Sequence, residues 1–106
     1  MNIQSEIIGR EKHISVMGLL DSQEDRQALV NLLHECDGVS EVHVTFFEAP
    51  TLPVDIVEAL KFHIESYPDV TCKIFVFHKH LSSYLNRLRI HNTFVFKKSL
   101  IQQQRL

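Results

Sequence analysis

The chain has 106 residues, of which 44% are hydrophobic and 23% are charged, and its formal net charge is −2. This length and composition are typical of one globular domain with a single core, so we expect residues 1–106 to form one domain with a C-terminal tail at 98–106. Apolar runs of at most four residues exclude a membrane-spanning helix, and the start of the chain lacks the basic and apolar blocks of a signal peptide, so we expect a cytoplasmic protein.

The first part of the chain predicts a β-hairpin followed by a helix. Residues 3–9 and 12–17 are short, β-branched segments joined by two polar residues, so we expect two antiparallel strands. Ser22 is a good helix N-cap, and an apolar stripe at helical spacing follows it. We therefore expect a helix over residues 22–35, ended by an Asp-Gly pair.

The remainder of the chain predicts strands alternating with helices. In chain order we expect a buried strand at 42–47, a helix that follows the corner at Pro50–Pro53 and is closed by Tyr67-Pro68-Asp69, a strand at 70–77 that is buried on both faces, a helix at 81–89 and a strand at 93–96. The order ββαβαβαβ predicts an α/β fold (α+β by some schemes). We expect a mixed, mostly parallel sheet of about five strands with helices packed on it, in which only the first strand runs against the others.

Three segments of the chain carry a family resemblance. The turn Gly18-Leu19-Leu20-Asp21 is similar to a G-x-L-D turn, residues 41–61 match a strand–loop–helix pattern without a gap, and residues 81–94 resemble a final helix in which leucines precede a phenylalanine. These features resemble the STAS domain, the fold of bacterial anti-sigma factor antagonists, over about residues 10–97. The resemblance implies a regulatory domain that acts by binding another protein.

One position departs from the pattern of that family. In the antagonists, the loop before the second helix carries Asp-Ser-Ser-Gly, and a serine or threonine there is phosphorylated by a partner kinase. The matching positions here read Pro53-Val54-Asp55-Ile56, so Asp55 stands at the phosphosite-equivalent position. Two interpretations stay open: Asp55 permanently imitates part of the phosphorylated state, or it is only a favourable acid at a helix N-terminus.

We therefore expect a non-catalytic protein-interaction domain that binds through the loop and N-terminus of the second helix. The resemblance implies an anti-sigma kinase-like partner or a larger regulatory assembly. The alternative is a small-ligand (anion or lipid) binding domain, or an accessory subunit of a transporter, that uses the same edge. We expect Leu52, Val54 and Ile56 to supply apolar contacts. The expected partner-binding residues form two segments: Leu20, Asp21 and Ser22, then Thr51, Leu52, Pro53, Val54, Asp55, Ile56 and Glu58.

Other chemistry finds little support in the sequence. No nucleophile elbow or glycine-rich phosphate loop occurs, so we expect neither catalytic residues nor a cofactor. His78 and His80 would share a face on a strand, but no acid or cysteine completes a metal site there, and the other five histidines are scattered without ligand spacing. Ser82-Ser83 are either ordinary helix residues or a phosphorylation site. Cys36 and Cys72 are expected to be reduced, buried thiols.

Charge is divided unevenly along the chain. Residues 1–69 hold all 13 acids and 4 bases, whereas residues 70–106 hold 7 bases and no acid. Such a dipole could steer a charged partner or favour a head-to-tail homodimer, unless the fold mixes the two halves. The acidic majority and a pI near 6.4 argue against nucleic-acid binding.

Overall fold

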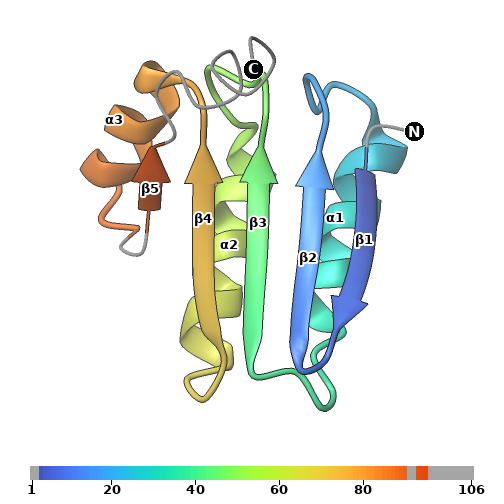
Figure 1. Ribbon diagram of the computed structural model, residues 1–106. Coiled ribbons are helices and arrows are strands. Elements are labelled where there is room, and N and C mark those ends of the chain that lie inside the picture. Colours follow the sequence, from blue (N-terminus) through green and yellow to red (C-terminus); the bar gives the residue numbers. More distant parts are fainter. Residues whose placement is uncertain (1–2, 91–92, 96–106) are drawn as a thin grey trace, which may run out of the picture.

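Five strands form one sheet in the order in which they occur in the chain (Figure 1). The computed structural model describes residues 3–90 and 93–95. Strand β1 pairs antiparallel with β2, and the other neighbouring strands pair in parallel. The elements are β1 (Ile3–Ile8), β2 (Glu11–Val16), α1 (Gln23–His34), β3 (Glu41–Phe46), α2 (Val54–Ser66), β4 (Thr71–Val76), α3 (Lys79–Arg87) and β5 (Thr93–Val95).

The predicted mixed α/β architecture is confirmed in its main part. Strands β1 to β4 each have six residues and, with the three helices, follow the predicted order ββαβαβα. The expected fifth strand is present only as a three-residue segment beside β4. Helix α3 begins at Lys79, two residues before its predicted start. The predicted tail at 98–106 lies outside the described residues.

One face of the sheet packs on helices, and within the described residues no helix covers the other. Helices α1 and α2 lie behind the strands in Figure 1, as expected when consecutive parallel strands are joined by crossovers of one hand. Buried and half-buried residues alternate along β2, β3 and β4, so each strand turns one side to the helices. The half-buried residues form what we call the open face: Glu11, His13, Ser15, Glu41, His43, Thr45, Lys73 and Phe75.

This alternation corrects the prediction for β4, which was expected to be buried on both faces. Cys72, Ile74 and Val76 face the helices and are buried, but Phe75 is only half-buried on the open face. The apolar run in the sequence therefore did not predict burial on both faces, because the described helices cover only one side of β4.

The core lies between the sheet and the helices. Its fully buried strand residues include Val44, Phe46 and Ile74, and the helices add leucine and isoleucine stripes. Burial of each such side chain stabilises the fold by about 1.5–3 kcal/mol. The predicted N-cap of α1 is confirmed, since the backbone N–H of Asp25 donates to Ser22 Oγ at 3.3 Å. No helix within the described residues is long and apolar enough to cross a membrane.

Lys12 is the exception on the helix-facing side of the sheet. It is 5% exposed, and its Nζ donates to Leu32 O at 2.8 Å and to Glu35 O. Both carbonyls belong to the C-terminal end of α1, where the helix dipole favours a positive charge. These contacts explain how a charged side chain is accommodated in the core.

Candidate functional site

The predicted binding segments meet at the edge of the sheet where β2 and β3 end, which we call the C-terminal rim (residues 17–22 and 47–58). The two segments lie side by side, because the backbone N–H of Phe47 donates to Val16 O at 3.1 Å. Together they line an open hollow of about 410 Å³. The expectation that β3 is an inner strand is confirmed, since it pairs with β2 on one side and β4 on the other.

Asp55 lies at this rim, in the first turn of α2. Its side chain is 60% exposed, and its Oδ1 accepts a hydrogen bond from the backbone N–H of Ile56 at 3.0 Å. Its Oδ2 lies 3.2 Å from Arg26 Nε, and Arg26 Nη1 donates to Leu20 O at 3.2 Å. Arg26 therefore ties the turn before α1 to the N-terminal end of α2. Sequence reasoning missed the role of Arg26, although it is the only Lys or Arg between Lys12 and Lys61.

The predicted rim residues divide into an exposed and a buried set. Three of the expected apolar residues, Leu20, Leu52 and Ile56, are 3%, 6% and 0% exposed, so they belong to the core. Ile56 offers no surface to a partner, whereas Leu52 also lines the hollow, so the expected contact of Leu52 with a partner stays a prediction. Pro53 is half-buried, and the exposed predicted residues are Asp21, Ser22, Thr51, Val54, Asp55 and Glu58.

The apolar surface of the rim comes from other positions. Val54 is 66% exposed, Leu19 is 52% exposed and Met17 is 44% exposed. Leu19 lines the hollow, and Val54 begins α2 next to Pro53, which also lines it. An apolar border around a hollow, with a fixed acid beside it, is a suitable geometry for binding a small protruding side chain or ligand.

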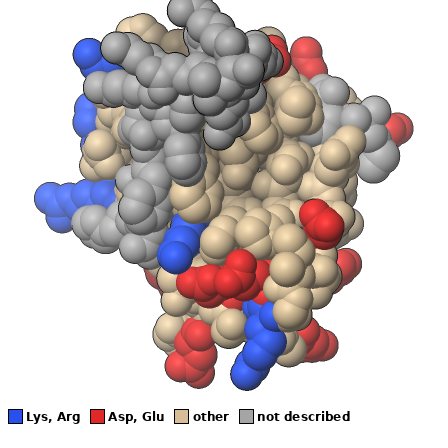
Figure 2. All heavy atoms as spheres, in the orientation of Figure 1, with Lys and Arg blue, Asp and Glu red and all other residues tan. Residues whose placement is uncertain are grey.

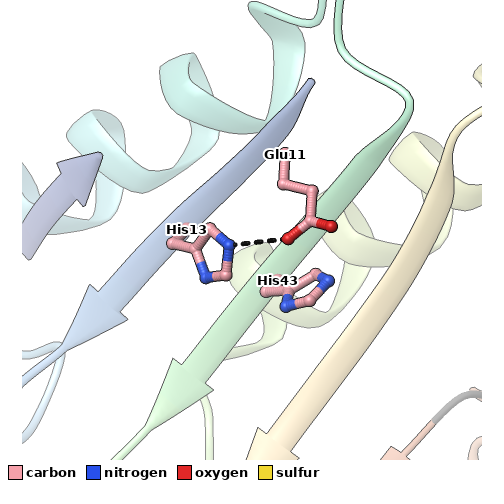
Figure 3. A group of neighbouring side chains, drawn as sticks. All are labelled: Glu11, His13 and His43. Atoms are coloured by element: carbon pink, nitrogen blue, oxygen red, sulfur yellow. Dashed lines mark hydrogen bonds and ion pairs between the residues drawn. The ribbon is translucent and has the colours of Figure 1, made fainter. Parts of the chain in front are cut away.

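A second group of polar side chains lies on the open face (Figure 3). Glu11 and His13 come from β2, His43 comes from β3, and all three lie on the same side of the sheet. His13 Nε2 lies 3.0 Å from Glu11 Oε1, and the two imidazole rings are 4.5 Å apart at their centroids. One ligand atom from each of the three residues lies within 4.8 Å of the others. The sequence-based view that these histidines are scattered without ligand spacing is therefore wrong.

Glu41 connects this group to β4. Its Oε1 lies 3.2 Å from Lys73 Nζ, and its Oε2 lies 3.4 Å from His43 Nε2. The hydrogen bond from Lys73, with a smaller contribution from His43, lowers the pKa of the Glu41 carboxyl below its usual value. The carboxylate is therefore charged at neutral pH.

Acidic and basic side chains lie close together on the open face. Acidic side chains gather on the lower part of the open face, with basic side chains beside them (Figure 2). The Lys73–Glu41 ion pair joins the basic second part of the chain to its acidic first part. The fold thus mixes the two charge halves at this point.

The other pair of histidines that the sequence singled out is arranged differently from the prediction. His78 is the N-cap of α3 and His80 lies inside that helix, so the two do not share a strand face. Their ring centroids are 5.4 Å apart, but among the described residues only Glu11, His13 and His43 form a group of three metal-ligating side chains. Ser82 is 8% exposed, which removes it as an accessible phosphorylation site, whereas Ser83 is exposed.

The two thiols are free and buried, as expected. Burial raises the pKa of Cys36, and it raises that of Cys72 to about 12. Cys36 Sγ lies 4.0 Å from His63 Nδ1, but burial also lowers the pKa of His63. The raised pKa of Cys36 and the lowered pKa of His63 favour a neutral thiol beside a neutral imidazole, and such a thiol is not an activated nucleophile.

No protein-family model matches this chain, and the search of curated proteins found no match.

Proposed function

We propose that this domain is a non-catalytic protein-interaction module, similar to a STAS domain, that binds a regulatory protein partner through its C-terminal rim. The supporting observation is the cluster of exposed Leu19, Val54 and Asp55 around a hollow lined by both rim segments. Apolar anchors of this kind supply most of the energy of small interfaces, and a charge beside them supplies orientation and association rate. The proposal includes a bacterial, cytoplasmic setting and an anti-sigma kinase-like or larger regulatory partner.

Arg26 holds the carboxylate of Asp55 in one orientation. An acid that rotated freely would lose side-chain entropy on binding, whereas an acid held by Arg26 at 3.2 Å is already oriented. A partner that recognises the modified form of a STAS-like loop would find here at most one of its two negative charges, and Arg26 offsets part of that charge.

Substitutions at the rim test the proposal. We expect Val54→Glu and Asp55→Arg each to reduce the capture of a partner from an extract of the source cells by at least tenfold. The control is Glu65→Arg, which has the same charge change at the far end of α2. The exposed Asp55–Arg26 pair contributes only about 0.2–1 kcal/mol, so Asp55→Arg should change the melting temperature little. Equal capture by all four proteins would remove the rim from the interface.

The rim hollow supports a second candidate function. Its volume of about 410 Å³ is in the range of small-molecule sites, so an anion or a lipid headgroup could bind there, including in an accessory subunit of a transporter. Thermal-shift measurements with inorganic phosphate and with short-chain phospholipids separate the two functions. A saturable rise in melting temperature without any protein partner, lost in Arg26→Met, would favour the ligand-binding function.

A further inference from the structure

The open face carries the same short sequence on two adjacent strands. Glu11-Lys12-His13 in β2 and Glu41-Val42-His43 in β3 both read Glu-x-His. Residues two apart on a strand share a face. The parallel register places Glu11 opposite Glu41 and His13 opposite His43, so two carboxylates and two imidazoles form a square.

We propose that Glu11, His13 and His43 form a binding site for a divalent cation of the zinc type. Two imidazole nitrogens and one carboxylate oxygen are a common ligand set for zinc sites that keep a fourth position open. The site lies on the open face and not at the C-terminal rim, so it does not depend on the proposed interaction.

The distances fit this set of ligands. Neighbouring ligand atoms of a tetrahedral zinc site are about 3.4 Å apart, since each lies about 2.0–2.1 Å from the metal. His13 Nε2 and Glu11 Oε1 are 3.0 Å apart, so a metal ion can replace the proton they share after a small opening of the pair. The corresponding atoms of the three residues lie no more than 4.8 Å from one another. Rotation of the His43 side chain can shorten its distances to the other two ligand atoms to those of a tetrahedral site.

The local charges favour a cation at this position. Glu11 and Glu41 are directly opposite each other on parallel strands, and like charges so placed destabilise a sheet. Lys73 forms an ion pair with Glu41 at 3.2 Å, and no ion pair with Lys or Arg is formed by Glu11 within the described residues. A divalent ion beside Glu11 would complete the compensation. Glu41 would then act as an outer partner held by Lys73.

Space for a fourth ligand is present beside His13. A hollow of about 270 Å³ is lined there by Gln4, Glu6 and Ser15, among others. Glu6 lies opposite His13 in the antiparallel register, on the same face. The three ligands are half-buried, with side-chain exposures of 42%, 34% and 16% for Glu11, His13 and His43, so an ion can reach them from solvent.

The test is a titration of the full chain with zinc chloride, in which isothermal titration calorimetry measures the affinity and the number of sites. We expect one saturable site in the wild type and at least a tenfold weaker affinity in His13→Gln and in His43→Gln. His80→Gln, which removes an exposed histidine elsewhere, should bind as the wild type does. Absence of a saturable site, unchanged affinity in both His13→Gln and His43→Gln, or an equal loss in His80→Gln would overturn the proposal.

A second measurement identifies the ligands directly. Long-range ¹H–¹⁵N spectra should show the imidazole nitrogens of His13 and His43 shifting together as one equivalent of zinc is added. In a parallel titration with cobalt(II), an intense thiolate-to-cobalt band would place the metal on Cys36 or Cys72 and overturn the assignment. Far-ultraviolet circular dichroism of each variant confirms that a lost affinity does not reflect lost folding.

Discussion

Replacement of Lys12 by methionine isolates the contribution of a buried charge to the stability of this fold. The substitution keeps an unbranched apolar side chain but removes the amine that donates to Leu32 O and Glu35 O. A hydrogen bond from a charged donor contributes roughly 1.5–3 kcal/mol. Because α1 would lose its link to β2, we expect Lys12→Met to lower the free energy of unfolding.

Two features of the structure limit the expected loss in the free energy of unfolding. Leu32 O also accepts from the backbone N–H of Glu35 at 3.4 Å, so mainly the Glu35 carbonyl loses its partner. That residue, with Lys12, lines an open hollow of about 530 Å³ through which water can reach the carbonyl. The expected loss is therefore about 2 kcal/mol, close to one charge-assisted hydrogen bond. For a domain of this size it corresponds to a melting temperature lower by about 10 °C.

Urea unfolding followed by circular dichroism measures this difference. Lys61→Met is the matched control, because Lys61 is exposed on α2, and we expect it to stay within about 0.5 kcal/mol of the wild type. Lys12→Ala should be less stable than Lys12→Met, since each buried methylene contributes about 0.8 kcal/mol. If Lys12→Met is as stable as the wild type, the cost of desolvating the amine cancels its hydrogen bonds and the reasoning fails.

Two further predictions concern pH and salt. Burial lowers the pKa of His63 below its usual value of 6.5, so the folded state favours the neutral imidazole. The stability that this provides is complete above pH 6.5 and is lost as the pH falls through the folded-state pKa. The slope of this loss is up to about 1.4 kcal/mol per pH unit. Urea unfolding of His63→Gln between pH 7 and 5 should show a flatter dependence than wild type and His80→Gln; an equal slope would contradict this. A head-to-tail homodimer held by the charge asymmetry should elute from size exclusion as a dimer at about 0.05 M salt and as a monomer at about 0.5 M, whereas a monomer at both would remove it.

Much of the fold followed from local patterns. The antiparallel hairpin needs only two strand-forming segments and a short joint, and Ser22 predicts the start of α1 through its own hydroxyl group. A strand–helix–strand passage also predicts parallel pairing, because the helix returns the chain to the end of the sheet at which the first strand began. These features depend on residues that are close together in the chain.

The sequence predicted the position of the rim in the fold, but it did not predict which of its side chains are exposed or which pair with each other. The C-terminal ends of β2 and β3 had to meet once the strands were neighbours, which brought Asp21 and Thr51 to one hollow. Helical spacing alone could not separate the exposed Val54 from the buried Ile56, because both are apolar and lie in the first turn of α2. The pairing of Arg26 with Asp55 depends on how α1 and α2 pack together.

The sequence by itself determined which residues can alternate along a strand and which can cap or continue a helix, because these properties act over a few residues. It also contained the two Glu-x-His segments in β2 and β3, but 30 positions separate them. Only the tertiary structure decided their register, since hydrogen bonding between parallel strands sets His13 against His43, on the side of the sheet opposite the described helices α1 and α2. The candidate metal site therefore exists in the sheet and in neither strand alone.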